Sequence, residues 1–197
     1  MKIGVGGGIG AGKSTVCRIL ARFGGKVFDS DAVAKSLYTR PDIRQKTENL
    51  LGADVYDGNT LRTSLISERL FSDPEKLRAL EAFLHPAVAQ LWEEFAQKAE
   101  SEGRWAIKES ALLLRSGRPT DVDKVIWVSA PERIRVLRVQ QRSGLSEAEI
   151  VARMRRQPDE SAVLLWVDAI VLNDGESLLL SQIAQIKRDF SEKAPRP

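Results

Sequence analysis

Residues 7–14 read Gly-Gly-Ile-Gly-Ala-Gly-Lys-Ser, a G-x-x-x-x-G-K-S pattern that follows the apolar run Ile3-Gly4-Val5 and precedes a helical pattern. The glycines allow the backbone to come close to an anion, so that consecutive N–H groups point toward it. The N-terminus of the following helix adds partial positive charge. A simple glycine-rich turn would not need Lys-Ser after its last glycine. The stretch therefore predicts a phosphate-binding loop.

The last residues of this loop indicate which phosphates it binds. In loops of this type the Lys13 ammonium reaches the β- and γ-phosphates, and the Ser14 hydroxyl binds the Mg²⁺ that bridges them. We therefore predict a nucleoside triphosphate as ligand, with Mg²⁺ as cofactor. The predicted nucleotide-binding residues of this segment are Gly8, Gly10, Ala11, Gly12, Lys13, Ser14 and Thr15.

Length and composition indicate a globular protein of one domain, residues 1–197, with 43% hydrophobic and 29% charged residues. The net charge of +3 is small for this length and does not imply a nucleic-acid partner. The chain has one cysteine, Cys17, which cannot form a disulfide framework. It starts on a strand without a signal segment and has no run of ~18 apolar residues, so we expect no membrane partner and a cytoplasmic location. The oligomeric state stays open.

Strand-like runs alternate with helical patterns along most of the chain. This alternation predicts an α/β fold in which helices cover both faces of a five-stranded parallel sheet, giving three layers. The runs are Lys2–Gly6, Lys26–Phe28, Trp105–Glu109, Lys124–Ser129 and Ala169–Leu172.

Residues 38–104 lie between the second and third runs and contain no convincing strand, which predicts a helical insertion. Helical periodicity covers Leu61–Phe71 and continues from Glu75 to about Ala99. Asp73-Pro74 predicts an N-cap followed by proline at the first helical position. His85-Pro86 predicts a break or a kink in the long helix.

A helical hairpin is predicted after the fourth strand. Pro131 to Arg142 has a helical pattern, Ser143-Gly144 forms a turn, and Ser146-x-x-Glu149 is a capping box that begins the next helix. Such a hairpin could act as a lid, which we place at residues 138–160.

Asp29-Ser30-Asp31 follows the second strand-like run directly. In a parallel α/β sheet this position lies at the carboxyl edge, where ligands bind. Asp31, with Asp29 beside it, could accept a hydrogen bond from a hydroxyl that attacks the γ-phosphate and so orient it. The alternative is that either aspartate only caps the helix starting near Ala32.

Glu109 ends the third strand-like run, where an acid commonly holds the magnesium ion or one of its waters. A plain surface glutamate is the alternative. Among the arginines between residues 133 and 156, Arg142 stands next to the Ser143-Gly144 turn and Arg138 one helical turn earlier. Arginine suits phosphate oxygens, so both are candidates for closing over the nucleotide, although we expect most of these arginines to be solvated helix charges. Arg62 is likewise either a residue that binds a phosphate of the acceptor or a solvated surface charge.

Taken together, these motifs resemble the dephospho-CoA kinase family from Ile3 to about Ile186. The loop is close to that family's form, and Val-Phe-Asp-Ser-Asp-Ala-Val-Ala-Lys resembles its Asp-Ala-Asp segment. Asp57-Gly58-Asn59-Thr60-Leu61-Arg62, Leu65, Phe71, Leu80-Glu81 and His85-Pro86 match its acceptor-binding stretch. Arg142, Arg153 to Gln157, and Asp168-Ala-Ile-Val-Leu-Asn173 are similar to its lid and final-strand motifs.

The resemblance implies transfer of the γ-phosphate of ATP to the ribose 3′-hydroxyl of dephospho-CoA, within the three-layer kinase fold built around such a loop. Its implied catalytic residues are Lys13, Asp31, Asp29 and Arg142. The implied acceptor-binding residues are Asp31, Arg62, His85, Leu112 and Leu113. Arg142 with the loop after Asn173 would hold the adenine of ATP. Arg138 stays a second candidate for the ATP site. Ser14 and Glu109, the latter directly or through a water, are the candidates for the magnesium site.

This chain departs from the family's Pro-Leu-Leu-Phe-Glu stretch, because it has Ala111, Leu114 and Arg115 where the family has proline, phenylalanine and glutamate. Glu109 stands where many members have aspartate, Lys35 where they often have arginine, and Ser30 where alanine is usual. A nucleoside or nucleotide kinase is the nearer alternative, and an ATP-gated switch or binding module is the more distant one. The Asn-Lys-x-Asp and Asp-x-x-Gly motifs of guanine-selective GTPases do not occur.

Overall fold

The computed structural model describes residues 1–115, 117–155, 157 and 159–192. The chain forms two compact units. The first contains residues 1–28 together with the chain from Ala96 onward, and the second contains Asp29–Phe95. The long helix α5 (Pro74–Ser101) belongs to both, because its first part lies in the second unit and its last residues lie in the first.

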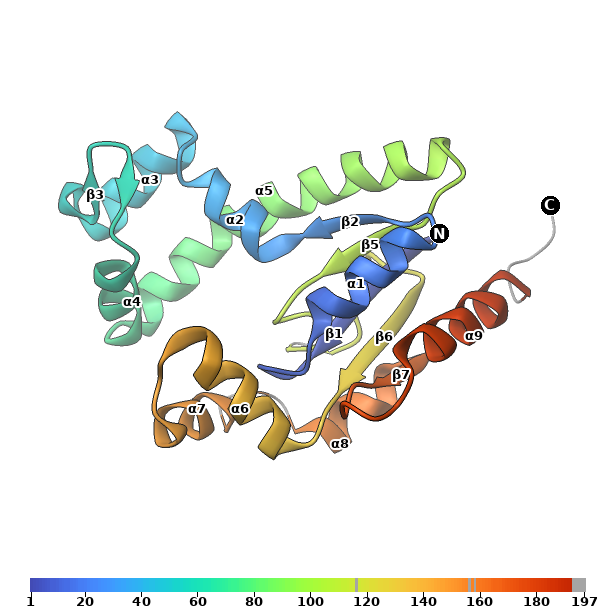
Figure 1. The fold of residues 1–197 in the computed structure, drawn as a ribbon. Helices are drawn as coiled ribbons and strands as arrows, with labels where there is room; N and C mark the ends of the chain where they lie inside the picture. The colour runs from blue at the N-terminus through green and yellow to red at the C-terminus, as the bar shows by residue number, and fades with distance from the viewer. Residues whose placement is uncertain (116, 156, 158, 193–197) are drawn as a thin grey trace. The chain divides into compact units, whose positions relative to one another are not determined.

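A five-stranded sheet forms the centre of the first unit, in the order β2-β5-β1-β6-β7 (Figure 1). Its strands are β1 (Lys2–Gly7), β2 (Lys26–Asp29), β5 (Ala106–Glu109), β6 (Lys124–Ser129) and β7 (Ala169–Leu172). β1 pairs in parallel with β5 and β6, and β6 pairs in parallel with β7. β1 and β6 are buried over most of their length, as expected for central strands covered on both faces. All five strands predicted from the sequence are confirmed.

Two helices, α1 (Lys13–Arg22) and α9 (Leu179–Glu192), lie side by side against this sheet (Figure 1). Both helices are amphipathic and present their apolar faces to the strands, so helices and strands share a core. Fully buried members of that core include Ile3, Val5, Val16, Ile126 and Ile183.

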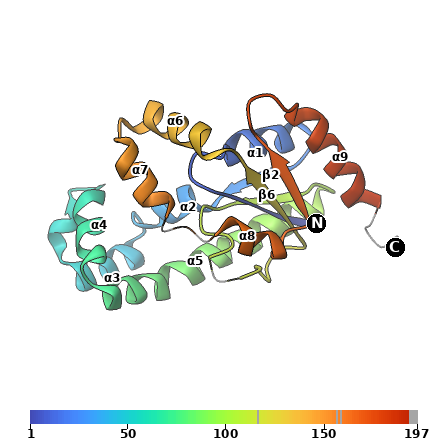
Figure 2. The same cartoon turned by 90° about the horizontal axis from the view of Figure 1, so that it is seen from below.

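The predicted hairpin is formed by α6 (Glu132–Ser143) and α7 (Glu147–Met154), which pack against each other (Figure 2). α6 is terminated by Gly144, the residue after its end, whose φ of 68° is the left-handed conformation that glycine adopts readily. The capping box at Ser146 and Glu149 is present, which confirms the predicted start of α7. α8 (Glu160–Val163) and the 3₁₀ helix η2 (Leu164–Trp166) follow.

The second unit contains α2 (Ser30–Leu37), α3 (Pro41–Leu51), the 3₁₀ helix η1 (Ala53–Val55), α4 (Thr63–Phe71) and the first part of α5. Two apolar clusters hold these helices together. Leu37, Ile43, Leu80 and Leu84 form one, and Leu51, Val55, Tyr56 and Ile66 form the other. The unit runs from residue 29 to residue 95, so its bounds differ from those of the helical insertion expected at 38–104.

The expectation that this region contains no strand was wrong. β3 (Tyr56–Asp57) and β4 (Thr60–Leu61) form an antiparallel hairpin, with Gly58 in its turn at a φ of 58°. Strands of two residues are too short to produce an alternating pattern, whereas Leu61 fits the helical periodicity that follows it. For the same reason α4 begins at Thr63 and not at Leu61.

Helix α5 begins as predicted, because Asp73 Oδ1 accepts hydrogen bonds from the backbone N–H groups of Glu75 and Lys76. These bonds hold the pKa of Asp73 below its ordinary value, with the bond from Lys76 contributing most. Of the two outcomes predicted at Pro86, a break or a kink, the break does not occur, since the helix continues through this residue. Proline removes one backbone hydrogen bond, while apolar residues on both sides of Pro86 pack into the same cluster. No helix in the described part of the chain is long and apolar enough to cross a membrane.

Candidate active site

The loop between β1 and α1 has the conformation that its glycines suggested. Gly10 and Gly12 have φ values of 78° and 94°, in the left-handed region that side chains disfavour. A Cβ atom on Gly12 would collide with Asn173 Nδ2, and one on Gly10 would lie 2.5 Å from the carbonyl oxygen of Arg135. Glycine is therefore required at both positions by conformation and by space.

The N-terminus of α1 is open toward the loop. Among the described side chains, none caps this helix and no acidic residue lies in its first turn. The helix's own first turn therefore contributes no charge that would neutralise the partial positive charge of its N-terminus. This is the electrostatic condition for an anion to bind there.

Lys13 and Ser14 begin this helix, and each contacts a group of the site. Lys13 Nζ donates to the carbonyl oxygens of Gly7 at 3.0 Å and Gly8 at 3.5 Å, so the ammonium lies over the loop. Ser14 Oγ donates to Glu109 Oε1 at 2.8 Å. Glu109 is placed there because β5 pairs in register with β1, opposite Val5.

The hydroxyl of Ser14 and the carboxylate of Glu109 form a small, hard oxygen donor set. Oxygen ligands of this kind suit Mg²⁺, which usually takes few ligands from the protein and keeps several waters. No cluster of three or more His, Cys, Asp or Glu side chains suited to a metal occurs within the described ranges. The residues present therefore fit a magnesium ion that is shared with a bound phosphate better than a metal enclosed by protein ligands.

Asn173 and Arg138 hold the loop from its other side. Asn173 follows β7 and is buried, and its Nδ2 donates to the carbonyl oxygen of Ala11 at 2.7 Å. Arg138 donates to the same oxygen at 3.4 Å, to the Asn173 carbonyl oxygen at 3.1 Å and to Asn173 Oδ1 at 3.2 Å. The structure thus brings both predicted nucleotide-binding residues to the loop, where their described bonds are made to protein atoms.

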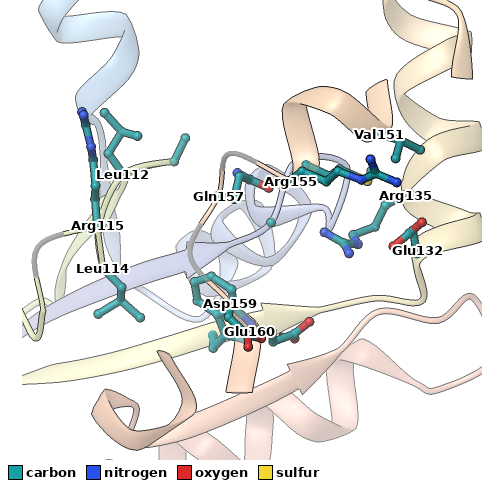
Figure 3. A pocket seen from close by; sticks show the side chains of 14 residues that line it. Leu112, Leu114, Arg115, Glu132, Arg135, Val151, Arg155, Gln157, Asp159 and Glu160 are labelled. Atoms are coloured by element: carbon teal, nitrogen blue, oxygen red, sulfur yellow. Dashed lines mark hydrogen bonds between the residues drawn. The ribbon is translucent and has the colours of Figure 1, made fainter. Parts of the chain in front are cut away.

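A cavity of about 640 Å³ opens beside Gly8 (Figure 3). Its lining combines apolar side chains with charged ones of both signs. One wall is the segment after β5, another is β6 with the start of α6, and a third is the chain from α7 to α8. The residues are Gly8, Ala111, Leu112, Leu114, Arg115, Trp127, Glu132, Arg135, Val151, Met154, Arg155, Gln157, Asp159 and Glu160.

Sequence reasoning named Gln157 only as the end of a resembled lid motif, and it did not single out Arg135. Gln157 Oε1 accepts a hydrogen bond from the backbone N–H of Ile9 at 2.8 Å, and Arg135 lies against Gly8 and Gly10. Arg135 could have been found, since it is three residues before Arg138 and so shares its helix face. Gln157 lies 148 residues from Ile9, and no local pattern indicates such a contact.

The other site predictions for the first unit have different outcomes. Leu112 lines the cavity, but Leu113 packs against the β1 glycines instead, where its Cδ2 would lie 2.9 Å from a Cβ atom on Gly4. Arg142 is exposed in the last turn of α6 and is not among the described residues that line the cavity. Thr15 Oγ1 accepts from Arg18 at 3.2 Å. Arg156, part of the predicted lid motif, lies outside the described residues.

The acceptor-binding candidates lie in the second unit, apart from the two leucines. Asp29 caps α2, with Oδ1 accepting from the Ala32 N–H at 2.9 Å, so the capping alternative is observed for this residue. Asp31 is exposed in the first turn of α2. Arg62 is exposed and pairs with Asp57 at 3.1 Å, and His85 is exposed on α5. Their part in acceptor binding stays a prediction.

Comparison with known proteins gives consistent matches over nearly the whole chain. A family model described as "Dephospho-CoA kinase" matches residues 1–178. A dephospho-CoA kinase from Porphyromonas gingivalis is 37% identical over 198 residues, covering 99% of this chain and 96% of that protein. A dephospho-CoA kinase from Chlorobaculum tepidum is 35% identical, covering 93% of this chain and 92% of that protein. The crystal structure of TT1252 from Thermus thermophilus superposes with a TM-score of 0.83 at 33% identity and 98% coverage of both chains.

Proposed function

The chain belongs to the dephospho-CoA kinase family, and from this we propose that it transfers the γ-phosphoryl group of ATP to the ribose 3′-hydroxyl of dephospho-CoA. The products are coenzyme A and ADP, and the reaction is the last step of coenzyme A biosynthesis. The observation that supports it most is the open loop at the start of α1, with Lys13, Ser14 and Glu109 beside it. We place the reaction in the cytoplasm.

At the phosphate end, the loop N–H groups and the N-terminus of α1 bind the β- and γ-phosphates. Lys13 exchanges its two carbonyl partners for phosphate oxygens and places a fixed positive charge where negative charge is redistributed during transfer. Asn173 and Arg138 keep the loop in position through Ala11. The protein therefore contributes chiefly position and charge, as expected for a loose transition state.

Ser14 and Glu109 would hold Mg²⁺, Ser14 directly and Glu109 directly or through a water. The ion, when bound, neutralises phosphate charge. Because Ser14 and Glu109 are already hydrogen-bonded to each other, both oxygens lie on one side of the loop without a further rearrangement of the backbone. This contact between a loop hydroxyl and a strand-end carboxylate supports a magnesium site at this point.

At the acceptor end, Asp31 orients the 3′-hydroxyl and takes up its proton as the new oxygen–phosphorus bond forms and the bond between the γ-phosphorus and the bridging oxygen of ADP breaks. Asp29 supports it by fixing the start of α2. Arg62, His85, Leu112 and Leu113 bind the remainder of dephospho-CoA, and Arg142 with the α6–α7 hairpin closes over the nucleotide. Closure of this kind would exclude water, which competes with the hydroxyl.

An acceptor screen tests this function. ADP release from ATP is measured with dephospho-CoA, adenosine and common nucleoside monophosphates as acceptors, with Mg²⁺ present. Dephospho-CoA should give by far the highest kcat/KM, and Lys13→Ala should remove the activity while Lys98→Ala, an exposed change at the end of α5, retains it. Preference for a nucleoside or a monophosphate would instead identify a nucleoside or nucleotide kinase.

A further inference from the structure

Arg135 packs directly against the phosphate-binding loop, at Gly8 and Gly10. It is on α6, and its backbone packs against Gly10, with its carbonyl oxygen 2.5 Å and its Cα 2.9 Å from the position of a Cβ atom there. Its Nη1 reaches over Gly8, so closely that even a methyl group on Gly8 would collide with it. Figure 3 shows Arg135 extending from α6 into the cavity that opens beside Gly8.

The bonding of Arg135 differs from that of Arg138, one helical turn later. Arg138 has three hydrogen-bond acceptors, all on Ala11 or Asn173. Within the described part of the chain, the guanidinium of Arg135 has no hydrogen bond and no ion pair, and its Nε is fully buried without an acceptor. Glu132 lines the same cavity but forms no ion pair with it. Buried N–H groups and partly buried cations are costly unless an acceptor is present.

The missing acceptor is best supplied by an anion at the loop. Lys13 Nζ lies on the carbonyl oxygens of Gly7 and Gly8, so two cations converge on the first residues of the loop. The planar fork of an arginine suits a phosphoryl group with several equivalent oxygens. Gln157 keeps this end of the loop in place through its bond to the Ile9 N–H.

We propose that Arg135 binds the γ-phosphoryl group of ATP and is a second fixed cation, beside Lys13, at the group being transferred. The proposal rests on the proposed function, because it names a further residue of the same site. It assigns to Arg135 the phosphoryl contact that the sequence suggested for Arg138 or Arg142. Arg138 then has the separate task of holding the loop to Asn173.

The test compares Arg135→Gln, Arg135→Lys and Arg133→Gln. Arg133 is exposed on the same helix, so its replacement removes an equal charge away from the loop. Binding of ATP and of ADP is measured without acceptor by isothermal titration calorimetry, with Mg²⁺ present, and kcat and KM follow with dephospho-CoA. Thermal melting checks that each variant is folded.

Arg135→Gln should weaken ATP binding or lower kcat/KM by roughly 10- to 100-fold, with ADP binding nearly unchanged because ADP lacks the γ-phosphate. Arg135→Lys should lose less ATP affinity and less kcat/KM than Arg135→Gln, because it keeps the positive charge. Arg133→Gln should match the wild type. Equal weakening of ATP and ADP would show that Arg135 only shapes the loop and would overturn the proposal. So would wild-type ATP binding and turnover in Arg135→Gln. Failure of the wild-type protein to phosphorylate dephospho-CoA would instead count against the proposed function.

Discussion

Ser30 is a buried polar residue that stands between Asp29 and Asp31 in the sequence. Its Oγ has no hydrogen-bond partner among the described residues. A buried hydroxyl without a partner loses its hydration and gains nothing in exchange. Since it stands where the resembled family usually has alanine, its removal should not disturb the local backbone.

We therefore predict that Ser30→Ala raises the free energy of unfolding, by about 1 kcal/mol. Urea denaturation of the purified protein measures this change. Ser36→Ala is the matched control, because Ser36 Oγ donates to the Val33 carbonyl oxygen at 2.8 Å on the same helix and its loss should give no gain. A clear loss of stability in Ser30→Ala would mean that its hydroxyl has a partner, such as an ordered water.

Asp31 provides the prediction for the acceptor end. Asp31→Asn keeps the shape of the side chain but removes its charge, so kcat should fall by roughly 10²- to 10⁴-fold while ATP binding stays normal. Steady-state kinetics together with ATP titration separate these effects. Asp42→Asn, an exposed change paired with Arg40 in the same unit, is the control. An unchanged kcat in Asp31→Asn would move the role to Asp29.

Individual residues of the site were predictable where a local pattern fixes their place. Gly10, Gly12, Lys13 and Ser14 belong to one contiguous motif, and the structure places the glycines in the expected loop and Lys13 and Ser14 at the start of α1. Arg135 was not singled out because the sequence shows charge but not which arginine lacks a partner. Arg138 has a partner because it donates a hydrogen bond to Asn173, which lies 35 residues away in the sequence. Local sequence does not indicate this contact.

At the scale of elements, Asp168 fixes the start of β7 against β6. Its Oδ2 accepts from the Val125 N–H and from Arg118, each at 2.8 Å, and its Oδ1 accepts from Lys124 at 3.1 Å. Burial alone would raise the pKa of Asp168, but the hydrogen bonds from Val125, Arg118 and Lys124 outweigh it and hold the pKa below its ordinary value. The ionised carboxylate is therefore favoured in the folded state.

A lowered pKa in the folded state means that Asp168 stabilises the protein at neutral pH and that this stabilisation is lost as the pH falls through the folded-state pKa. Asp168→Asn should lower the free energy of unfolding by about 1–3 kcal/mol at pH 7, with a smaller difference in acid. Denaturant titrations of the wild type and of Asp168→Asn, from pH 7 into the acid range, measure this difference in the free energy of unfolding. Glu176→Gln, an exposed control, should stay close to the wild type, whereas a difference for Asp168→Asn that is independent of pH would contradict this account.

The α6–α7 hairpin provides a second prediction at this scale. If it closes over bound substrates, hydrogen exchange of its backbone amides, residues 138–155, should slow when ATP and dephospho-CoA are both present. Helix α9 is the internal control, since it packs in the core beside α1. Exchange in the hairpin that is unaffected by both ligands would show that it is not a lid.

Element boundaries were predictable where apolar periodicity or capping chemistry is strong. The capping box of α7 and the Asp73 cap of α5 follow from local residues alone. The β3–β4 hairpin was not predicted, and the local pattern did not decide between a break and a kink at Pro86. Both outcomes depend on packing within the second unit.

At the scale of the whole molecule, the order β2-β5-β1-β6-β7 explains why distant segments meet in the first unit. β1 is central, so the loop that follows it is next to the ends of β5 and β6, and Asn173 follows β7 on the same edge. Ligands bind at this edge in parallel sheets of this kind. The alternation of strands and helices predicted the fold class, but the order of the strands depends on contacts between residues far apart in the sequence.

The most direct test of the central claim, that the loop delivers the γ-phosphoryl group to a sugar hydroxyl, is ³¹P NMR of the products formed from ATP and dephospho-CoA. The account predicts a new phosphomonoester signal coupled to the ribose 3′ proton, appearing in step with ADP. It would be contradicted if the phosphorus appeared only as inorganic phosphate, or as an ester at another position of the acceptor.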